Sequence, residues 1–323
     1  MAGTWLVTGG AGFIGSNLVR AILKEGRRVR VLDNFLTGFR VNLEEVMADV
    51  ELLEGDLRDA AACCRACAGA EVVFHEAALP SVPRSMNDPV TSFHCNTVGT
   101  FNMLAAARDA GVRRFVFAAS SSAYGANEEL PKRESMPVMP LSPYAADKAC
   151  GETWVATFYR AFGLQTVSLR YFNIFGPRQD PTNQYAGVIA AFATAMIGGR
   201  RPTIFGDGTQ SRDFTFVENV LHANLLAAKV PETHGEVVNI GCGDSINLND
   251  MVALFNKSLG TRLEHVYAPP RARDDKHSLA DISAARKLLG YVPQVRFAEG
   301  LARTIDWYRR AIETGYGGWG RKP

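Results

Sequence analysis

The sequence has no long apolar run. Its longest apolar stretch, Gly187–Gly199, is bounded by glycine and is shorter than the ~20 residues that a membrane-spanning helix needs. The N-terminus leads directly into the strand-like run Trp5–Val7, without the basic and apolar segments of a secretory signal. We therefore expect no membrane partner, and we expect a cytoplasmic protein.

A large excess of charge of one sign and a metal-binding cysteine pattern are also missing. The chain has 35 lysines and arginines and 33 acidic residues. This net charge of +2 does not indicate a nucleic-acid partner. Six cysteines include the cluster Cys63, Cys64 and Cys67, but no fourth ligand or second pair follows at a suitable spacing. We interpret the cluster as small apolar residues on a helix face and expect no metal site.

The first half of the chain alternates strand and helix patterns. Its 323 residues, 47% hydrophobic and 21% charged, suit a globular protein of one large or two modest domains. Helical periodicity between apolar runs, as in Asn17–Lys24 and Val98–Ala110, predicts an α/β fold with a Rossmann-type, doubly wound parallel sheet. The runs expected as buried strands are Trp5–Val7, Val29–Leu32, Val50–Leu53, Val72–Phe74, Phe115–Ala118 and Thr166–Leu169.

The composition changes after about Arg170, where proline and glycine become frequent. We predict a nucleotide-binding domain over residues 1–172 and a smaller mixed α/β C-terminal substrate domain over residues 173–323. Ligands of open α/β sheets bind at the carboxyl edge, over which the second domain should lie. A helix-then-strand pattern at Phe216–Ile240 indicates that the chain returns to the first domain around residues 216–242.

The stretch GGAGFIG, Gly9–Gly15, ends the first expected strand and opens the first expected helix. Glycines at such a junction let the backbone approach a pyrophosphate, and the helix N-terminus offers free N–H groups. Gly10, Gly12 and Gly15 fit one dinucleotide fingerprint. If Gly9 is counted as the first glycine instead of Gly10, the motif fits the pattern of short-chain dehydrogenases. The stretch alone does not choose between these two registers.

A carboxylate follows the second expected strand. Asp33 lies eighteen positions beyond Gly15, where an acidic side chain accepts both hydroxyls of an adenosine ribose and repels a 2′-phosphate. NAD is therefore favoured over NADP. Asp56, after the third expected strand, is placed for a contact to the adenine.

Tyr144 and Lys148 are four residues apart on an expected helix and therefore share one face. A nearby ammonium stabilises a tyrosinate and lowers the tyrosine pKa from its ordinary value of about 10, which suits acid–base catalysis. An upstream strand ends in Ser120–Ser122, whose hydroxyls can bridge a substrate and the tyrosine. This set accompanies the register that uses Gly9, so Gly10 is expected to be a permissive turn residue.

With these motifs in order, the chain resembles the extended short-chain dehydrogenases/reductases, and among them the UDP-hexose 4-epimerases. The resemblance spans nearly the whole chain and is carried by TGGAGFIGS, HEAALPSVPRS, SSSAYG, YAADK, RYFNIFGPRQDP, GDGTQSRDF and RARDD. It implies that Tyr144 is the acid and base and that Lys148 holds the nicotinamide ribose while tuning the tyrosine. Ser120 is the favoured catalytic hydroxyl, and Ser122 is its alternative and a substrate contact.

The resemblance also implies a redox-neutral reaction, in which hydride leaves carbon 4 of a UDP-sugar for a resident NAD and returns to the other face. The implied cofactor contacts are Gly9, Gly12, Phe13, Ile14, Gly15, Asp33, Asn34, Gly38, Asp56, Leu57, Ala77, Ala78, Asn96, Ser120, Tyr144, Lys148 and Phe172. The implied substrate contacts are Ser81, Arg84, Ser122, Asn173, Gln179, Gly187, Val188, Arg212, Arg271, Asp274 and Ser278.

Four residues bear on the choice of sugar. Ser278 stands where, in this family, a bulky residue restricts the pocket to non-acetylated sugars, and Gly187 also leaves room. Gln179 can hydrogen-bond an acetamido group or a carboxylate. Pro80 departs from the glycine of strict acetamido-sugar enzymes. We expect UDP-GlcNAc/UDP-GalNAc interconversion, with UDP-Glc/UDP-Gal also used.

Several alternatives stay open to different degrees. A 4,6-dehydratase needs an Asp-Glu pair, and a UDP-glucuronate decarboxylase a glutamate, where this chain has Ser121 and Ser122. A UDP-glucuronate 4-epimerase is closer, because Arg84 or Arg178 can take a carboxylate. A non-catalytic NAD-binding regulator on this fold usually lacks the tyrosine or the lysine. By analogy with the family we expect a homodimer formed through a helix bundle.

Overall fold

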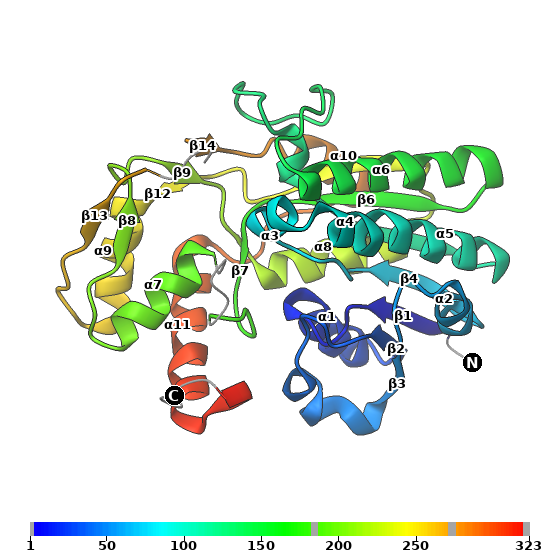
Figure 1. The fold of residues 1–323 in the computed structure, drawn as a ribbon, viewed down its shortest axis with the longest axis horizontal. Coiled ribbons are helices and arrows are strands. Elements are labelled where there is room, and N and C mark those ends of the chain that lie inside the picture. Colours follow the sequence, from blue (N-terminus) through cyan, green and yellow to red (C-terminus); the bar gives the residue numbers. More distant parts are fainter. Residues whose placement is uncertain (1–2, 182–186, 271–275, 319–323) are drawn as a thin grey trace.

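A seven-stranded parallel sheet forms the centre of the larger part of the molecule (Figure 1). The computed structural model describes residues 3–181, 187–270 and 276–318. The strands of this sheet are β1 (Thr4–Thr8), β2 (Arg28–Asp33), β3 (Val50–Glu54), β4 (Ala70–His75), β5 (Arg114–Ser120), β6 (Thr166–Tyr171) and β11 (Glu236–Ile240). Their order is β3-β2-β1-β4-β5-β6-β11, and every neighbouring pair is parallel. The fold class predicted from the sequence is confirmed, since all six expected strands lie in this sheet.

Helices cover both faces of the sheet. Successive side chains of a strand point to opposite faces, so Trp5 and Val7 belong to one apolar core and Leu6 to another. The second core includes Cys63 and Cys67, as expected of small apolar residues on a helix face. The first core lies under α1 (Phe13–Lys24), α8 (Val217–Lys229) and α10 (Ser283–Leu289), and the second under α2 (Ala60–Cys67), α5 (Gly99–Asp109) and α6 (Pro143–Phe162).

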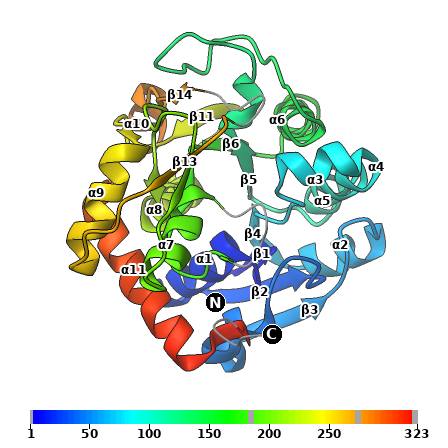
Figure 2. The ribbon, with the colours of Figure 1, turned by 60° about the vertical axis from the view of Figure 1, so that its left-hand side comes forward.

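A smaller part lies beside the sheet (Figure 2). It has an apolar core of its own, which includes Phe192, Phe255 and Tyr308. Its helices are α7 (Val188–Ile197), α9 (Leu248–Leu259) and α11 (Phe297–Thr314). Short strands pair as β7 (Ile174–Phe175) with β10 (Thr215–Phe216), β8 (Thr203–Phe205) with β13 (Val266–Ala268), and β9 (Ser211–Arg212) with β12 (Ile246–Asn247) and β14 (His277–Ser278). This mixture of helices and short strands agrees with the predicted smaller α/β part. The domain boundary at residue 172 stays a prediction.

The strand order reverses between β1 and β4, and a ligand crevice is expected at the carboxyl edge of the sheet at this point. Beyond β4 the chain forms α3 (Val82–Asn87), α4 (Pro89–Phe93) and a π-helical turn, His94–Val98, which leads into α5. Within the described ranges, no helix has the length and apolar character to cross a membrane. The same residues contain no cluster of three potential metal ligands.

Candidate active site

The turn between β1 and α1 requires glycine at two positions. Gly9 has a φ of +69°, and a Cβ on Gly15 would stand 2.1 Å from the Gly9 carbonyl oxygen. No side chain caps the start of α1 at Gly12, so its first N–H groups are available to an anion. Gly10 is not the permissive turn residue that we expected, because a Cβ there would stand 2.6 Å from a methyl group of Val31. Packing against β2, rather than turn geometry, requires that glycine.

Asp33 ends β2 beside this turn. Its Oδ2 accepts the N–H of Ala11 at 2.8 Å, and its Oδ1 accepts the N–H of Phe35 at 2.8 Å. Burial raises the pKa of Asp33, and the backbone donors offset part of that effect. Since each carboxylate oxygen has a second lone pair, this fixed side chain can also accept ribose hydroxyls.

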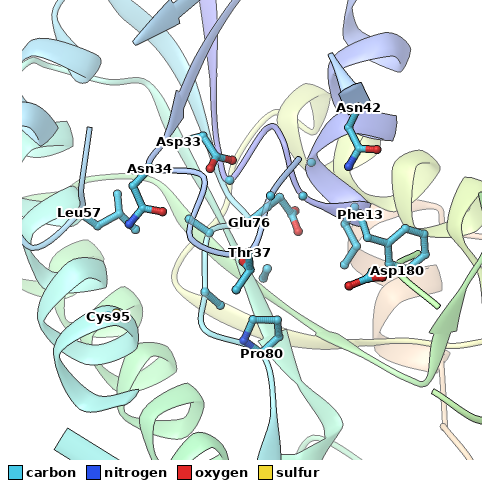
Figure 3. Close-up of a pocket in the computed structure, with 18 of the residues that line it drawn as sticks. Phe13, Asp33, Asn34, Thr37, Asn42, Leu57, Glu76, Pro80, Cys95 and Asp180 are labelled. Atoms are coloured by element: carbon cyan, nitrogen blue, oxygen red, sulfur yellow. The ribbon is translucent and has the colours of Figure 1, made fainter. Parts of the chain in front are cut away.

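A cavity runs from the glycine turn along the carboxyl edge of the sheet, and we call it the glycine-turn cavity (Figure 3). Asp56 lies on its wall and accepts a hydrogen bond from Asn34 at 2.8 Å. Hydrogen bonds from Arg58 lower the pKa of Asp56. The predicted cofactor residues that line this cavity are Gly9, Gly12, Phe13, Ile14, Gly15, Asp33, Asn34, Gly38, Asp56, Leu57, Ala77, Ala78, Tyr144 and Lys148.

The glycine-turn cavity fits a dinucleotide. Asp33, on its wall, offers a fixed acceptor for ribose hydroxyls. The uncapped N–H groups of α1 and the close backbone of the glycine turn suit a pyrophosphate. Tyr144 and Lys148 lie on its wall as well, so a dinucleotide there would reach the predicted acid–base pair.

Tyr144 lines both the glycine-turn cavity and a second one, which we call the serine cavity. It lies in the first turn of α6, which starts after Ser142, whose Oγ accepts the N–H of Ala145 at 3.2 Å. Ser120 lines the serine cavity beside Tyr144, and its side chain lowers the tyrosine pKa through hydrogen bonding. Ser122 Oγ donates to Ser120 Oγ at 2.9 Å. The geometry therefore brings Ser120 to the tyrosine, with Ser122 one hydrogen bond further away.

Burial controls the proton affinity of this pair. Burial raises the pKa of Tyr144, and the hydrogen bond with Ser120 offsets part of the rise. Burial lowers the pKa of Lys148 to about 8, while its Nζ donates to the Ala118 carbonyl oxygen at 2.7 Å. Desolvation of the phenolate dominates in this structure, and the expected lowering of the Tyr144 pKa by Lys148 stays a prediction.

Two buried acidic residues tie α6 to its neighbours on both sides of the lysine. Asp147 accepts the hydroxyl of Ser92 at 2.7 Å and that of Thr97 at 3.0 Å. Glu152 forms two hydrogen bonds of 2.7 Å with the guanidinium of Arg170, on β6. These contacts fix the helix, and with it the tyrosine and the lysine, against the sheet.

The serine cavity opens toward the smaller part of the molecule. Parallel pairing of β14 with β9 puts Ser278 next to Arg212 in register. Among the described residues that line this cavity, none is aspartate or glutamate. The predicted site residues that line it are Phe13, Ile14, Ser120, Ser122, Tyr144, Phe172, Asn173, Gln179, Arg212 and Ser278.

Three predicted cofactor residues do not line the glycine-turn cavity, and one of them, Ser120, lines the serine cavity. Asn96 is buried behind its wall, where its Oδ1 accepts the N–H of Leu79 at 2.7 Å and its Nδ2 donates to Ser92. The side chain thereby supports the backbone after β4 rather than reaching the cavity. Phe172 is fully buried and lines the serine cavity instead.

The predicted substrate residues are more dispersed. Arg84 and Gly187 line the glycine-turn cavity and not the serine cavity, whereas Gln179 lines both. Ser81 caps α3 by accepting the N–H of Arg84 at 3.1 Å, and Val188 begins α7; neither lines either cavity. Two predicted residues, Arg271 and Asp274, lie outside the described residues.

Sequence reasoning missed several polar residues of the glycine-turn cavity, among them Glu76 and Asn42. Glu76 follows β4, and its Oε1 accepts the hydroxyl of Tyr171 at 2.8 Å. A charged residue inside the otherwise apolar run VVFHEAAL was a signal that could have found it. Asn42 donates to the carbonyl of Ala11 and accepts the hydroxyl of Tyr316, from the other end of the chain. No local sequence pattern predicts the contact between Asn42 and Tyr316.

Comparison with known proteins agrees with this geometry. Residues 5–241 match the NAD dependent epimerase/dehydratase family. A UDP-glucose 4-epimerase of Mycolicibacterium smegmatis is 40% identical over 308 residues, which cover 94% of this chain and 98% of that protein.

Solved structures agree over nearly the whole chain. A UDP-N-acetylglucosamine 4-epimerase from Methanobrevibacter ruminantium, in complex with UDP-N-acetylmuramic acid, has a TM-score of 0.91 and 36% identity, covering 96% of this chain and 99% of that one. A Thermotoga maritima UDP-glucose 4-epimerase with UDP-glucose has a TM-score of 0.91, 37% identity and the same coverage. The fold and site thus define a Rossmann-type enzyme that uses NAD. The chain belongs to the NAD-dependent epimerase/dehydratase family, which confirms the resemblance seen in its sequence.

Proposed function

We propose that the protein interconverts the C4 epimers of a UDP-hexose with NAD as resident cofactor. The observation that carries this proposal is the position of Tyr144, on a wall common to both cavities and beside Ser120, which lines the serine cavity with it. A group there can exchange a proton with a sugar hydroxyl in the serine cavity while facing a dinucleotide in the glycine-turn cavity.

Tyr144, Lys148 and the two serines each have a defined task in this proposal. Bound NAD supplies the acceptor for hydride from carbon 4 and the donor that returns it. Tyr144 takes the proton of the sugar's 4-hydroxyl and later gives it back. Ser120 holds that hydroxyl and the tyrosine in line, with Ser122 supporting Ser120 at 2.9 Å. Lys148, whose burial lowers its pKa to about 8, supplies a positive charge near the phenolate and a donor for the nicotinamide ribose.

The walls of the serine cavity favour epimerisation over dehydration. Elimination of water from a sugar needs an acid beside the substrate, and the described lining residues include no aspartate or glutamate. Ser121 and Ser122 occupy the wall where a dehydratase would carry that pair. A ketone formed at carbon 4 then has no route except return of the hydride.

The lining also supports an acetamido sugar as one substrate. Ser278 is small and lies next to Arg212, which the family resemblance implies as a substrate contact, so a bulkier side chain at residue 278 would narrow the sugar-binding part of the serine cavity. Gln179 donates its Nε2 to the Ile174 carbonyl at 3.3 Å, which leaves an acceptor, Oε1, for an acetamido N–H. We expect Ser278→Tyr to abolish UDP-GlcNAc turnover and to spare UDP-Glc turnover; equal loss of both would contradict the role of Ser278.

A UDP-glucuronate 4-epimerase is the second candidate. Arg178 is a poor carboxylate ligand, because its Nη1 donates to Asn17 at 3.0 Å and its Nη2 to Glu45 at 3.4 Å. Arg84 lines the glycine-turn cavity and forms no ion pair with the described residues, so it is the arginine that supports this alternative.

One experiment separates these substrates. The purified protein is incubated separately with UDP-Glc, UDP-GlcNAc and UDP-GlcA, and the epimer ratio is followed to equilibrium. We expect UDP-GlcNAc and UDP-Glc to epimerise. Turnover of UDP-GlcA alone would replace the proposal by the second candidate. A regulator without activity would turn over none of the three and would be stabilised against heat by NAD but not by UDP.

We further propose a homodimer in the cytoplasm, where nucleotide sugars and NAD are both present. Aromatic and aliphatic side chains are exposed on neighbouring helices: Val90 and Phe93 on α4 are 65% and 48% exposed, Phe101 on α5 39%, and Phe162 on α6 52%. Such a patch marks an interaction surface. Light scattering should give twice the chain mass, and Phe101→Glu should give monomers; a wild-type monomer would contradict the dimer.

A further inference from the structure

Glu76 is a buried carboxylate for which the reaction described above has no task. It follows β4 at the carboxyl edge of the sheet and lines the glycine-turn cavity together with Tyr144 and Lys148. In Figure 3 its carboxylate is seen in the central part of the cavity, between Asp33 and Asp180. Glu76 is therefore placed to act on whatever occupies that cavity.

The hydrogen bonds of Glu76 are incomplete. Its Oε1 accepts the hydroxyl of Tyr171 at 2.8 Å, and Asn224 Nδ2 donates to that hydroxyl oxygen at 2.8 Å. Its Oε2 is buried and has no partner among the described residues. Burial raises the pKa of Glu76 to about 7, and the charge of Lys148 opposes that rise. A glutamine would keep the contact with Tyr171 without the cost of a buried charge, so the contact alone does not account for a carboxylate.

Asp33 and Asp56 also line the cavity, and each has hydrogen-bond partners of its own. Asp33 is held by two backbone N–H groups after β2, and Asp56 pairs with Arg58 at 2.7 Å. Glu76, by contrast, interacts electrostatically with Lys148, beside the tyrosine. The oxidised nicotinamide ring is cationic and the reduced ring is neutral. A cationic ring bound next to Lys148 would bring two positive charges together, and a carboxylate close to both offsets their repulsion.

We propose that Glu76 is a cofactor-binding residue whose negative charge selects the oxidised dinucleotide over the reduced one. The inference rests on the proposed use of a resident NAD. It gives the residue a function in a redox-neutral cycle, since an enzyme that starts from a sugar alcohol must rest with its cofactor oxidised. A preference for the oxidised form also favours return of the hydride to the keto sugar over its retention.

The test compares the affinities of both cofactor forms. NADH is titrated by its fluorescence and displaced by NAD⁺, in wild type and in Glu76→Gln. Loss of the negative charge of Glu76 from the cofactor cavity should raise the Kd for NAD⁺ about tenfold and leave the Kd for NADH within about twofold. Glu76→Leu is a second neutral variant in case the glutamine variant does not fold, and it should behave alike.

Two controls separate charge from structure. Tyr171→Phe removes the hydrogen bond and keeps the carboxylate, so the ratio of the two dissociation constants should stay within about twofold of wild type. Asp180→Asn removes a charge from another wall of the same cavity and should leave the ratio unchanged as well.

Three results would overturn the inference: a ratio unaffected in both neutral variants, an equal loss of affinity for both forms, or an equal effect of Asp180→Asn. If wild type binds neither form, the cofactor assignment fails together with the inference. If both forms bind but no UDP-sugar is turned over, only the proposed function fails.

Discussion

The ion pair between Glu152 and Arg170 is buried, and loss of one partner should lower the stability of the fold. The side chains are 6% and 3% exposed, and the two hydrogen bonds between them are both 2.7 Å long. Glu152→Ala leaves the guanidinium of Arg170 buried above the ring of Tyr124 without a counter-charge. Breaking one partner of a buried pair in this way costs about 3–5 kcal/mol. We therefore expect the free energy of unfolding to fall by that amount in urea titrations followed by tryptophan fluorescence.

A matched control is available on the surface. Arg303 and Glu218 are joined at 2.8 Å, but their side chains are 46% and 52% exposed, so Glu218→Ala should cost less than about 1 kcal/mol. Replacing both buried partners, as Glu152→Leu with Arg170→Met, should recover most of the loss because no unpaired charge remains. If Glu152→Ala destabilised the protein no more than the surface control, the buried pair would not anchor α6 to β6.

Three further predictions concern the glycine-turn cavity and the tyrosine. Tyr144→Phe should lower kcat by about 10²–10⁴-fold and leave NAD content unchanged by absorbance, because it removes only the acid–base group; retained activity would exclude that role. Asp33→Ala should raise the Kd for NAD about tenfold or more and weaken discrimination against NADP in calorimetric titrations, since charged acceptors contribute about 1.5–3 kcal/mol; an unchanged NAD/NADP ratio would refute it. Gly15→Ala places a Cβ 2.1 Å from the Gly9 carbonyl oxygen, so NAD should no longer raise the Tm.

The sheet was predictable from the sequence because its strands are buried on both faces. A run such as Phe115–Ala118 is apolar at every position, and its neighbours have the same character, so each reads as a strand of a parallel sheet. The pattern at Phe216–Ile240 indicated a return to the first domain, but it did not indicate that β11 pairs with β6, which lies about seventy residues earlier. Its place depends on the tertiary path of the chain, which no local pattern encodes.

The candidate site was predictable where chemistry and local geometry coincide. Gly15 and Asp33 follow strands at fixed offsets, so motif spacing gave their place. Asn96 shows the limit, because an amide can line a cavity or brace the loop behind it, and only the packing around Leu79 distinguishes the two. The proton affinity of Tyr144 shows a similar limit. The spacing to Lys148 is local, whereas the desolvation that raises the tyrosine pKa comes from the whole surroundings.

Glu76 also gives a stability prediction that does not depend on cofactor. Burial raises its pKa from 4.5 to about 7, so the folded state binds the proton more tightly than the unfolded state between these values. The favourable contribution of the protonated side chain is therefore fully present below about pH 4.5 and is lost as the pH rises through 7. A shift of this size corresponds to about 3 kcal/mol at most.

Glu76→Gln removes the titration and keeps the shape. In cofactor-free protein its stability relative to wild type should rise between pH 5 and pH 8 and then level off, as measured by urea unfolding at each pH. A glutamine variant that is less stable than wild type at pH 8, with the gap widening as the pH rises, would mean that the ionised carboxylate stabilises the fold. In the expected case the carboxylate weakens the empty protein at the pH where it would favour the oxidised cofactor, a trade-off of stability against function.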